Sequence, residues 1–472
     1  MRPRRLLELL TLFVLGVALG AGVRTAGAAM PAPDRFWAVG VRAFEDGLYD
    51  LAYEQLGRFA RVAPADPRRG DAAFLRGKAA FAMGRFAEAL TEFQASEALP
   101  LTVITAGEPL YWQAETLFRL RRFEFARERY TVFLRQYPRS AQAADALYAR
   151  AFAELELGRS DEALASLQAL LRDHVGRDLA PSAAYALARE LVRLQRWGDA
   201  LPLLSTYASR FPKSHFLPEV RYLLGISQLE AGRSAEGVRT LAAFVTAHPG
   251  HDLAPNARWV LAEAHERAGR AREALEQYQA LAKRAPAHPL APGALHHAGD
   301  LAQRLGRTAE AEAAWTALRR EHPRDALAAA AGLDLANLHL KRKQFDQAME
   351  LAREVAEAGG PSRLEALLTL GESALRGGKT PEAARAYEAA LGEAPARSSE
   401  RFRALAGVGL VAEVEKDVEA ARRAYQEIAR DAEDAELTRW AKTRLQGLEA
   451  HDKPAPREAP KAKPKAKKAA PS

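Results

Sequence analysis

Three stretches of this chain follow one pattern: MGRFAEAL at residues 83–90, LGRSDEAL at 157–164 and AGRAREAL at 268–275. In each stretch a small residue stands directly before the final Leu. Small residues recur every 37 positions in this place, at Ala52, Ala89, Ala126, Ala163, Ala200, Gly237, Ala274, Ala311 and Ala348, with further copies at Ala383 and Ala421. A fixed period of this length predicts a solenoid of stacked repeats instead of separate globular domains.

The repeat around Ala163 shows how the 37 residues are used. A helix is predicted over residues 143–157, because apolar and small residues recur there at helical spacing. Gly158 ends it, since glycine adopts the positive φ that often follows a helix. Asp161 and Glu162 begin a second helix, where the helix dipole favours negative charge. A proline closes many repeats, at Pro138, Pro212, Pro249, Pro286 and Pro323. One helix pair cannot bury both its faces, so neighbouring pairs are expected to stack.

The composition limits the chemistry of the chain. Of its 472 residues, 48% are hydrophobic, which is ample for burial. Cysteine does not occur in the sequence, which excludes disulfides, thiolate catalysis, Cys-ligated zinc and a lipid-modified Cys. The formal net charge of +8 is concentrated at the two ends: residues 1–28 carry +3 and residues 453–472 carry +6, which leaves −1 for the body. This distribution does not indicate a nucleic-acid groove, and no nucleic-acid partner is expected.

The two ends of the chain differ from the repeats. Residues 1–28 resemble a secretory signal peptide, with Arg2, Arg4 and Arg5, an apolar run over residues 9–23 and a small-x-small site at 26–28. The apolar run is shorter than the ~20 residues of a membrane-spanning helix. Cleavage after this segment is one alternative, and an uncleaved inner-membrane anchor over residues 6–23 is the other. Both place the body in the periplasm. At the other end, residues 431–450 predict a capping helix, and residues 451–472 form a Lys/Ala/Pro tail that is expected to be disordered.

Residues 33–430 resemble the tetratricopeptide repeat family. Twelve positions before the periodic small residue stands a second small residue, at Gly40, Gly77, Ala114, Ala151, Ala188, Gly225, Ala262, Gly299, Ala336 and Gly371. Four positions after it stands a bulky residue, at Leu56, Phe93, Tyr130, Leu167, Leu204, Leu241, Tyr278, Trp315 and Tyr387. The resemblance implies a right-handed α-solenoid of about eleven helix pairs. The typical repeat length of the family is 34 residues. The longer repeat of this chain resembles that of exported family members that act in outer-membrane assembly and in the Tol-Pal system.

The sequence does not predict an enzyme. SALRGGKT at 373–380 lacks the first glycine of a phosphate-binding loop and follows a helix instead of a strand. The pairs His248 and His251, and His296 and His297, lack the further ligands that a closed metal site needs. No catalytic residue, cofactor or metal site is therefore expected.

An aromatic series on the first helices is the candidate binding site. It lies 15 positions before the periodic small residue, at Trp37, Phe74, Tyr111, Tyr148, Tyr185, Tyr222, Trp259 and His296. In tetratricopeptide repeats this position resembles those that face the concave groove. One interpretation is a ladder of rings for an extended ligand; the other is packing between repeats, since aromatic side chains bury large areas.

Two functions follow from these observations as hypotheses. The first is a non-catalytic periplasmic scaffold that holds envelope proteins or peptides in its groove, in envelope assembly, division or a trans-envelope machine. The alternative is a cell-wall or polysaccharide-binding accessory protein, which uses the aromatic ladder and attracts peptidoglycan or another anionic polymer through its basic tail. A third possibility is a helical arm for a separate wall-cleaving enzyme.

Overall fold

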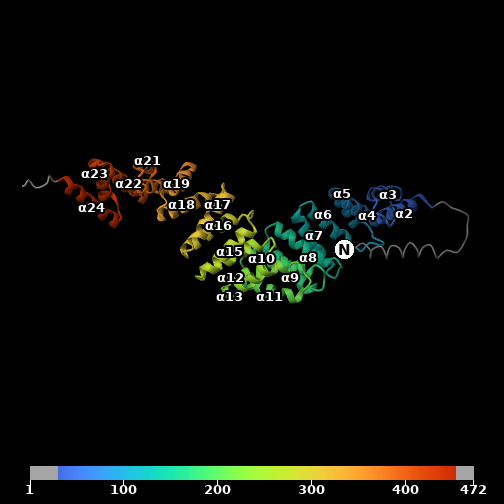
Figure 1. Cartoon of the computed structure of the whole chain (residues 1–472). Helices are drawn as coiled ribbons and strands as arrows, with labels where there is room; N and C mark the ends of the chain where they lie inside the picture. The colour runs from blue at the N-terminus through green and yellow to red at the C-terminus, as the bar shows by residue number, and fades with distance from the viewer. Residues whose placement is uncertain (1–29, 453–472) are drawn as a thin grey trace, which may run out of the picture. The chain divides into compact units, whose positions relative to one another are not determined.

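The computed structural model describes residues 30–452, which form 23 helices and no strand (Figure 1). The first twelve are α2 (Ala32–Glu45), α3 (Tyr49–Val62), α4 (Arg69–Ala82), α5 (Phe86–Glu97), α6 (Glu108–Arg119), α7 (Phe123–Gln136), α8 (Ala143–Glu156), α9 (Ser160–Asp173), α10 (Ala180–Arg193), α11 (Trp197–Arg210), α12 (Leu217–Glu230) and α13 (Ser234–Ala247). The others are α14 (Ala254–Arg267), α15 (Ala271–Arg284), α16 (Ala291–Arg304), α17 (Thr308–Glu321), α18 (Ala326–Lys341), α19 (Phe345–Ala358), α20 (Arg363–Arg376), α21 (Thr380–Glu393), α22 (Ser399–Glu415), α23 (Val418–Asp431) and α24 (Ala435–Asp452). The predicted all-α solenoid of eleven helix pairs is confirmed, with α24 following the last pair.

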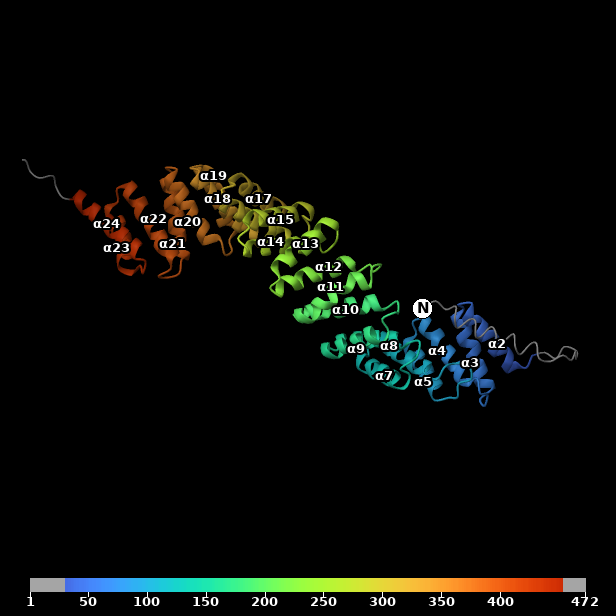
Figure 2. The ribbon, with the colours of Figure 1, turned by 90° about the horizontal axis from the view of Figure 1, so that it is seen from below.

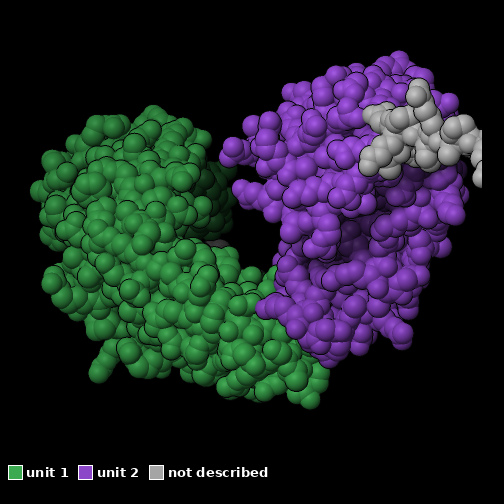
Figure 3. Space-filling model, turned by 90° about the vertical axis from the view of Figure 1, so that its left-hand side faces the viewer, with its two compact units in different colours: residues 1–240 green, residues 241–472 purple. Residues whose placement is uncertain are grey.

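The chain divides into two compact units, which we call unit 1 (residues 1–240) and unit 2 (residues 241–472) (Figure 3). Within unit 1, consecutive helices pack on each other from the pair α2 and α3 to the pair α11 and α12, and the same holds in unit 2 from the pair α14 and α15 to the pair α23 and α24 (Figures 1 and 2). The predicted signal segment and the basic tail lie outside the described residues. Within residues 30–452, no helix is both long and apolar enough to cross a membrane.

The periodic small residues allow the two helices of a repeat to approach closely. Ala89 and Ala163 are fully buried, as are most residues at this position. Gly77 shows the same closeness from the other helix, because a Cβ added there would lie 2.7 Å from Cδ1 of Phe93. The bulky side chain of the second helix therefore packs directly against the small residue of the first helix.

The turn inside each repeat requires a residue with positive φ. Gly158 has φ of 72°, and six further repeats have a glycine with positive φ at or next to this place. Four repeats lack the glycine, and there Arg121, Gln195, Lys343 and Lys416 take the left-handed conformation, with φ between 57° and 64°. The backbone geometry of the turn is thus kept even where the residue disfavours it.

A side-chain cap in the turn between repeats was not predicted from the sequence. Here a side-chain acceptor binds the backbone N–H two residues later, just before the next first helix begins. The acceptors stand 37 or 74 residues apart, at Asp66, Ser140, Ser214, His251, His288 and Asp325, with N–H to acceptor distances of 2.8–3.3 Å. Asp, Ser and His can all supply this acceptor. The residue type at this position therefore varies between repeats, and the hydrogen bond is not evident from the sequence.

The hydrophobic core follows the helix pairs, and the last helix covers its end. In the cluster around Tyr425, helix α24 contributes the fully buried Ala441 and the partly buried Trp440. The Tyr425 and Trp440 rings meet edge to face at 5.3 Å. Helix α24 therefore buries the face that the last pair leaves uncovered.

The first helices of successive repeats contact one another on one face of each unit. Such contacts join α2 to α4, α6 to α8 and α10 to α12 in unit 1, and α16 to α18, α18 to α20 and α20 to α22 in unit 2. In the described part of either unit, no pair of second helices comes as close. The first helices therefore line the inner side of the curve within each unit. We call this surface the inner face.

Candidate functional site

The eight residues of the aromatic series lie on the eight first helices from α2 to α16, but they are not equally exposed. Phe74 and Tyr111 are core residues, with exposed fractions of 2% and 8%. The Phe74 ring packs on Phe93 at 5.7 Å, and the Tyr111 ring packs on Phe133 at 5.5 Å. The packing interpretation holds at these two positions, and the expected ladder does not extend through α4 and α6.

In α6 the half-buried ring is Trp112, one residue beyond the predicted position. The Lys78 ammonium of α4 lies 3.1 Å from the centre of this ring. Burial lowers the pKa of Lys78 to about 8, although the nearby carboxylates Glu108 and Glu115 act in the opposite direction. Trp112 in turn donates from Nε1 to a Glu108 oxygen at 3.1 Å. A cation, a ring and two acids thus link α4 to α6 on the inner face.

Three half-buried tyrosines follow on consecutive first helices, α8, α10 and α12. Tyr148 packs on Phe152 of its own helix at 4.8 Å, and Tyr185 stacks on Phe216 at 4.3 Å with an angle of 13° between the rings. Phe216 directly precedes α12, so the second contact joins two first helices. Burial raises the pKa of Tyr222 and of Tyr148. These rings contribute to packing and still keep part of their surface open.

Arg189 provides a positive charge between these rings. It stands one turn beyond Tyr185 on α10, with its guanidinium 5.9 Å from the centre of that ring. It also lies close enough to Tyr148 of α8 to offset part of the rise in the pKa of that residue. Arg189 is exposed and forms no ion pair within residues 30–452. Its guanidinium is therefore available to an anionic group.

The remaining members of the series are held by neighbours. Trp37 packs on Phe59 at 5.4 Å, and Arg68 lies 5.4 Å over its ring. In unit 2, Trp259 meets Tyr278 edge to face at 5.2 Å, and its ring lies over Gly293, where an added Cβ would come within 3.0 Å. Both tryptophans are half-buried, so these contacts leave only part of each ring exposed.

His296 is the polar member of the series. Its Nδ1 lies 3.3 Å from an Asp300 oxygen, and its Nε2 lies 3.4 Å from an Asp334 oxygen on the next first helix. Hydrogen bonding to these two carboxylates raises the pKa of His296 to about 9. Among residues 30–452, these three form the one group of potential metal ligands close enough to share an ion. Because both ring nitrogens face carboxylates, the geometry suits a doubly paired imidazolium better than a metal ligand.

The motifs that the sequence analysis weighed as chemical sites fall in turns. Gly378 of SALRGGKT has φ of 75° and occupies the positive-φ turn that follows α20, as expected. His251 caps the start of α14 through Nδ1, and its ring lies 6.4 Å from that of His248. His297 stacks on Tyr278 at 5.1 Å. Each of these residues has a structural role.

The aromatic series predicted from the sequence does not include Trp112, Lys78, Phe152, Arg189 or Phe216. Lys78, Phe152 and Arg189 each stand four positions after a member of the aromatic series, one helical turn along the same face. A search of that second position, one helix turn on, could have found them. The repeat spacing does not point to Trp112, because this residue stands one position after the periodic aromatic position.

Comparison with known proteins gives a family match. The tetratricopeptide repeat model matches residues 40–100, 111–184, 222–289, 297–363, 333–398 and 368–436. A search of curated proteins finds no match. Similar solved structures include Naa15/Naa10 bound to HypK-THB, with a TM-score of 0.42 and 15% identity, over 89% of this chain and 66% of that chain.

Two further solved structures are matched over nearly their whole length. One is the C-terminal part of a TPR repeat-containing protein from Cytophaga hutchinsonii, with a TM-score of 0.43 and 14% identity, over 55% of this chain and 98% of that chain. The other is YrrB, described as a TPR protein with an unusual peptide-binding site, with a TM-score of 0.34 and 22% identity, over 44% of this chain and 96% of that chain.

Proposed function

Because the chain belongs to the tetratricopeptide repeat family, whose fold serves as a scaffold for protein–protein interactions, we propose that it holds a protein partner on the inner face of unit 1. The ligand is an extended peptide segment that places apolar side chains against the tyrosine rings and an acidic group against Arg189. Proteins of this family are generally non-catalytic, and the proposed scaffold does no chemistry of its own.

The observation that carries this proposal is the set Tyr148, Tyr185 and Tyr222 together with Arg189. Three consecutive first helices each present a half-buried ring, and an exposed guanidinium that has no ion pair among residues 30–452 stands among them. Aromatic rings and arginine are the side chains most enriched where protein interfaces gain their binding energy. Rings already fixed by packing lose little conformational freedom when a ligand binds.

The proposed place of action is the periplasm, in envelope assembly, division or a trans-envelope machine. This part of the proposal rests on the sequence pattern of residues 1–28 and on the long repeat, which is similar to exported members of the family. Cell fractionation with N-terminal sequencing of the mature protein tests it. An N-terminus near residue 29 in the periplasmic fraction supports export with cleavage, and a full-length cytosolic protein refutes export.

The binding proposal is tested by identifying proteins that cross-link to the tagged full chain in native cell envelopes. Changing Tyr148, Tyr185 and Tyr222 to Ala is expected to remove a small set of specific partners while the helical circular dichroism is retained. Arg189→Ala tests the acidic contact separately. Phe125→Ala is the matched control, because Phe125 is an aromatic residue with 51% exposure on the second helix α7.

Two outcomes would contradict the proposal. Partners that remain bound to the triple variant would place the interface elsewhere. A protein that captures no partner but sediments with purified cell wall would favour the alternative hypothesis of a polymer-binding accessory. In that event deletion of residues 453–472 would show whether the basic tail contributes, through a loss of salt-sensitive sedimentation.

A further inference from the structure

A buried arginine in unit 2 has no acidic partner. Arg258 of α14 is 9% exposed, and its Nη1 donates to Gln277 Oε1 at 3.1 Å. Within residues 30–452 it forms no ion pair. Burial lowers the pKa of Arg258, and the positive charge of Arg284 lowers it further. A buried charge of this kind is costly unless an opposite charge meets it.

The repeat pattern shows that this position does not require a charge. The equivalent positions of other repeats, multiples of 37 residues away, hold Leu147, Ala184 and Leu295, and the preceding repeat holds Arg221, which is exposed. Leu147 and Leu295 are buried in the core, with exposed fractions of 7% and 9%. An arginine that is buried at this position, with no ion pair among residues 30–452, is therefore a departure that packing does not explain.

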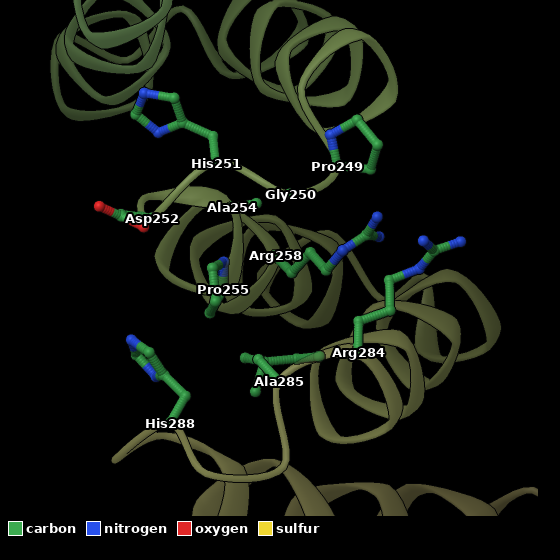
Figure 4. Close-up of a pocket in the computed structure, with 11 residues that line it drawn as sticks. Pro249, Gly250, His251, Asp252, Ala254, Pro255, Arg258, Arg284, Ala285 and His288 are labelled. Atoms are coloured by element: carbon green, nitrogen blue, oxygen red, sulfur yellow. The ribbon is translucent and has the colours of Figure 1, made fainter.

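Arg258 lines a cavity of about 500 Å³ between the turns that precede α14 and α16. Arg284, at the end of α15, lines the same cavity and is exposed. Figure 4 shows the two guanidinium groups side by side, with the Asp252 carboxylate on the opposite side. His251 and His288 line the cavity on that opposite side. The cavity volume lies in the range of small-molecule sites.

We propose that this cavity binds a small molecule that carries an oxyanion, either a carboxylate or a phosphate, between Arg258 and Arg284. Each guanidinium group is planar and offers several N–H donors, whose spacing matches the paired oxygens of these anions. The N-terminus of α14, whose first residues Ala254 and Pro255 line the cavity, adds a favourable dipole. The site belongs to unit 2 and is independent of the peptide surface in unit 1.

Calorimetric titration of the full-chain protein with inorganic phosphate and with acetate, each at a fixed ionic strength set by chloride, tests the site. Wild type should bind at least one of the two probes, and the preferred probe distinguishes phosphate from carboxylate. Arg258→Leu places the residue of neighbouring repeats at this position and should weaken binding at least about tenfold. Arg284→Gln should weaken it as well, and this exposed position does not endanger the fold.

The matched control is Arg221→Leu, which removes an exposed arginine at the same repeat position 37 residues earlier and should leave the affinity unchanged. In chloride alone, Arg258→Leu should raise the unfolding midpoint, because it removes a buried charge that forms no ion pair among residues 30–452. The proposal is overturned if wild type binds neither probe, if the Arg258 and Arg284 variants bind as tightly as wild type, or if Arg258→Leu is less stable in chloride.

Discussion

The inner faces of the two units use the same repeat positions for different chemistry. In unit 1, tyrosine and tryptophan rings stand beside the cations Lys78 and Arg189. In unit 2, the corresponding positions on α16 hold His296 and Asp300, which form an ion pair with each other. The core positions of the repeats remain alike, as the fully buried small residues show. The repeat therefore fixes where an inner-face side chain stands, whereas its chemistry can differ from repeat to repeat.

The largest expected effect is a difference in the stability lost when two members of the aromatic series, Phe74 and Tyr148, are changed to Ala. Phe74→Ala should cost about 3–5 kcal/mol of unfolding free energy, because it opens a cavity in the core. Tyr148→Ala should cost about 1 kcal/mol, since part of that ring is already exposed. Urea denaturation followed by circular dichroism measures both, with hydrogen exchange of α4 and α8 to localise the loss. Equal losses would assign Tyr148 to the core and remove it from the proposed peptide surface.

A second prediction uses the buried lysine of unit 1. Lys78→Met should stabilise the protein at neutral pH by up to about 3 kcal/mol, the free energy that corresponds to a pKa lowered to about 8. The unfolded chain holds the proton more tightly than the folded chain, so wild-type stability rises as pH increases from about 8 to the unfolded pKa of about 10.4. The advantage of the variant should therefore shrink across this window. Urea denaturation across the same pH range checks this, and a constant advantage would contradict the assigned cause.

His296 of unit 2 should show the opposite pH dependence. Its pKa in the folded protein, about 9, lies above the unfolded value. Its ion pairs therefore stabilise the protein fully below about pH 6.5, and this contribution is lost as pH rises through about 9. Because Asp300 and Asp334 are partly exposed, the contribution is about 1–2 kcal/mol.

The comparison of wild type with His296→Gln tests whether the stabilisation by His296 decreases as the pH rises. The difference in unfolding free energy should be largest near pH 6 and should decline through pH 9. Asp334→Asn removes one of the two partners and should reduce the effect without abolishing it. A difference that grows with pH would show that His296 is neutral in the folded protein and would leave the three side chains open as a metal site.

The sequence was sufficient for the helix pairs because their geometry depends on side-chain size at fixed spacing. The prediction of a helix over residues 143–157 and a glycine turn at Gly158 agrees with α8 and with the φ of 72°. The exposure of the aromatic side chains on the inner face could not be predicted from the repeat spacing. Whether a ring such as Tyr111 is buried depends on the size of its neighbours on other helices, which the period does not specify.

The burial of two charges, Lys78 and Arg258, also could not have been predicted from the sequence. Lys78 and Arg258 each occur among 68 lysines and arginines, and nothing in the local sequence marks them as buried. Their environment arises from residues more than ten positions away, Trp112 for one and Gln277 and Arg284 for the other. The burial of both charges, and the lack of an ion pair for Arg258 among residues 30–452, are properties of the folded chain alone.

The smallest expected effect concerns the turn that both units share. Gln195 has φ of 57° where the preceding repeat has Gly158 with φ of 72°. A residue with a side chain is destabilised in the left-handed region of φ and ψ. Gln195→Gly removes this penalty but increases the conformational freedom of the unfolded chain. The net effect should be a stabilisation of about 0.5–1 kcal/mol. Gly158→Gln should destabilise it by a similar amount, because no atom lies within 4 Å of the added Cβ and backbone strain alone acts. Thermal unfolding of both variants measures the pair. If Gln195→Gly is the less stable protein, contacts of the Gln195 side chain outweigh the strain, and the turn is more than a backbone requirement.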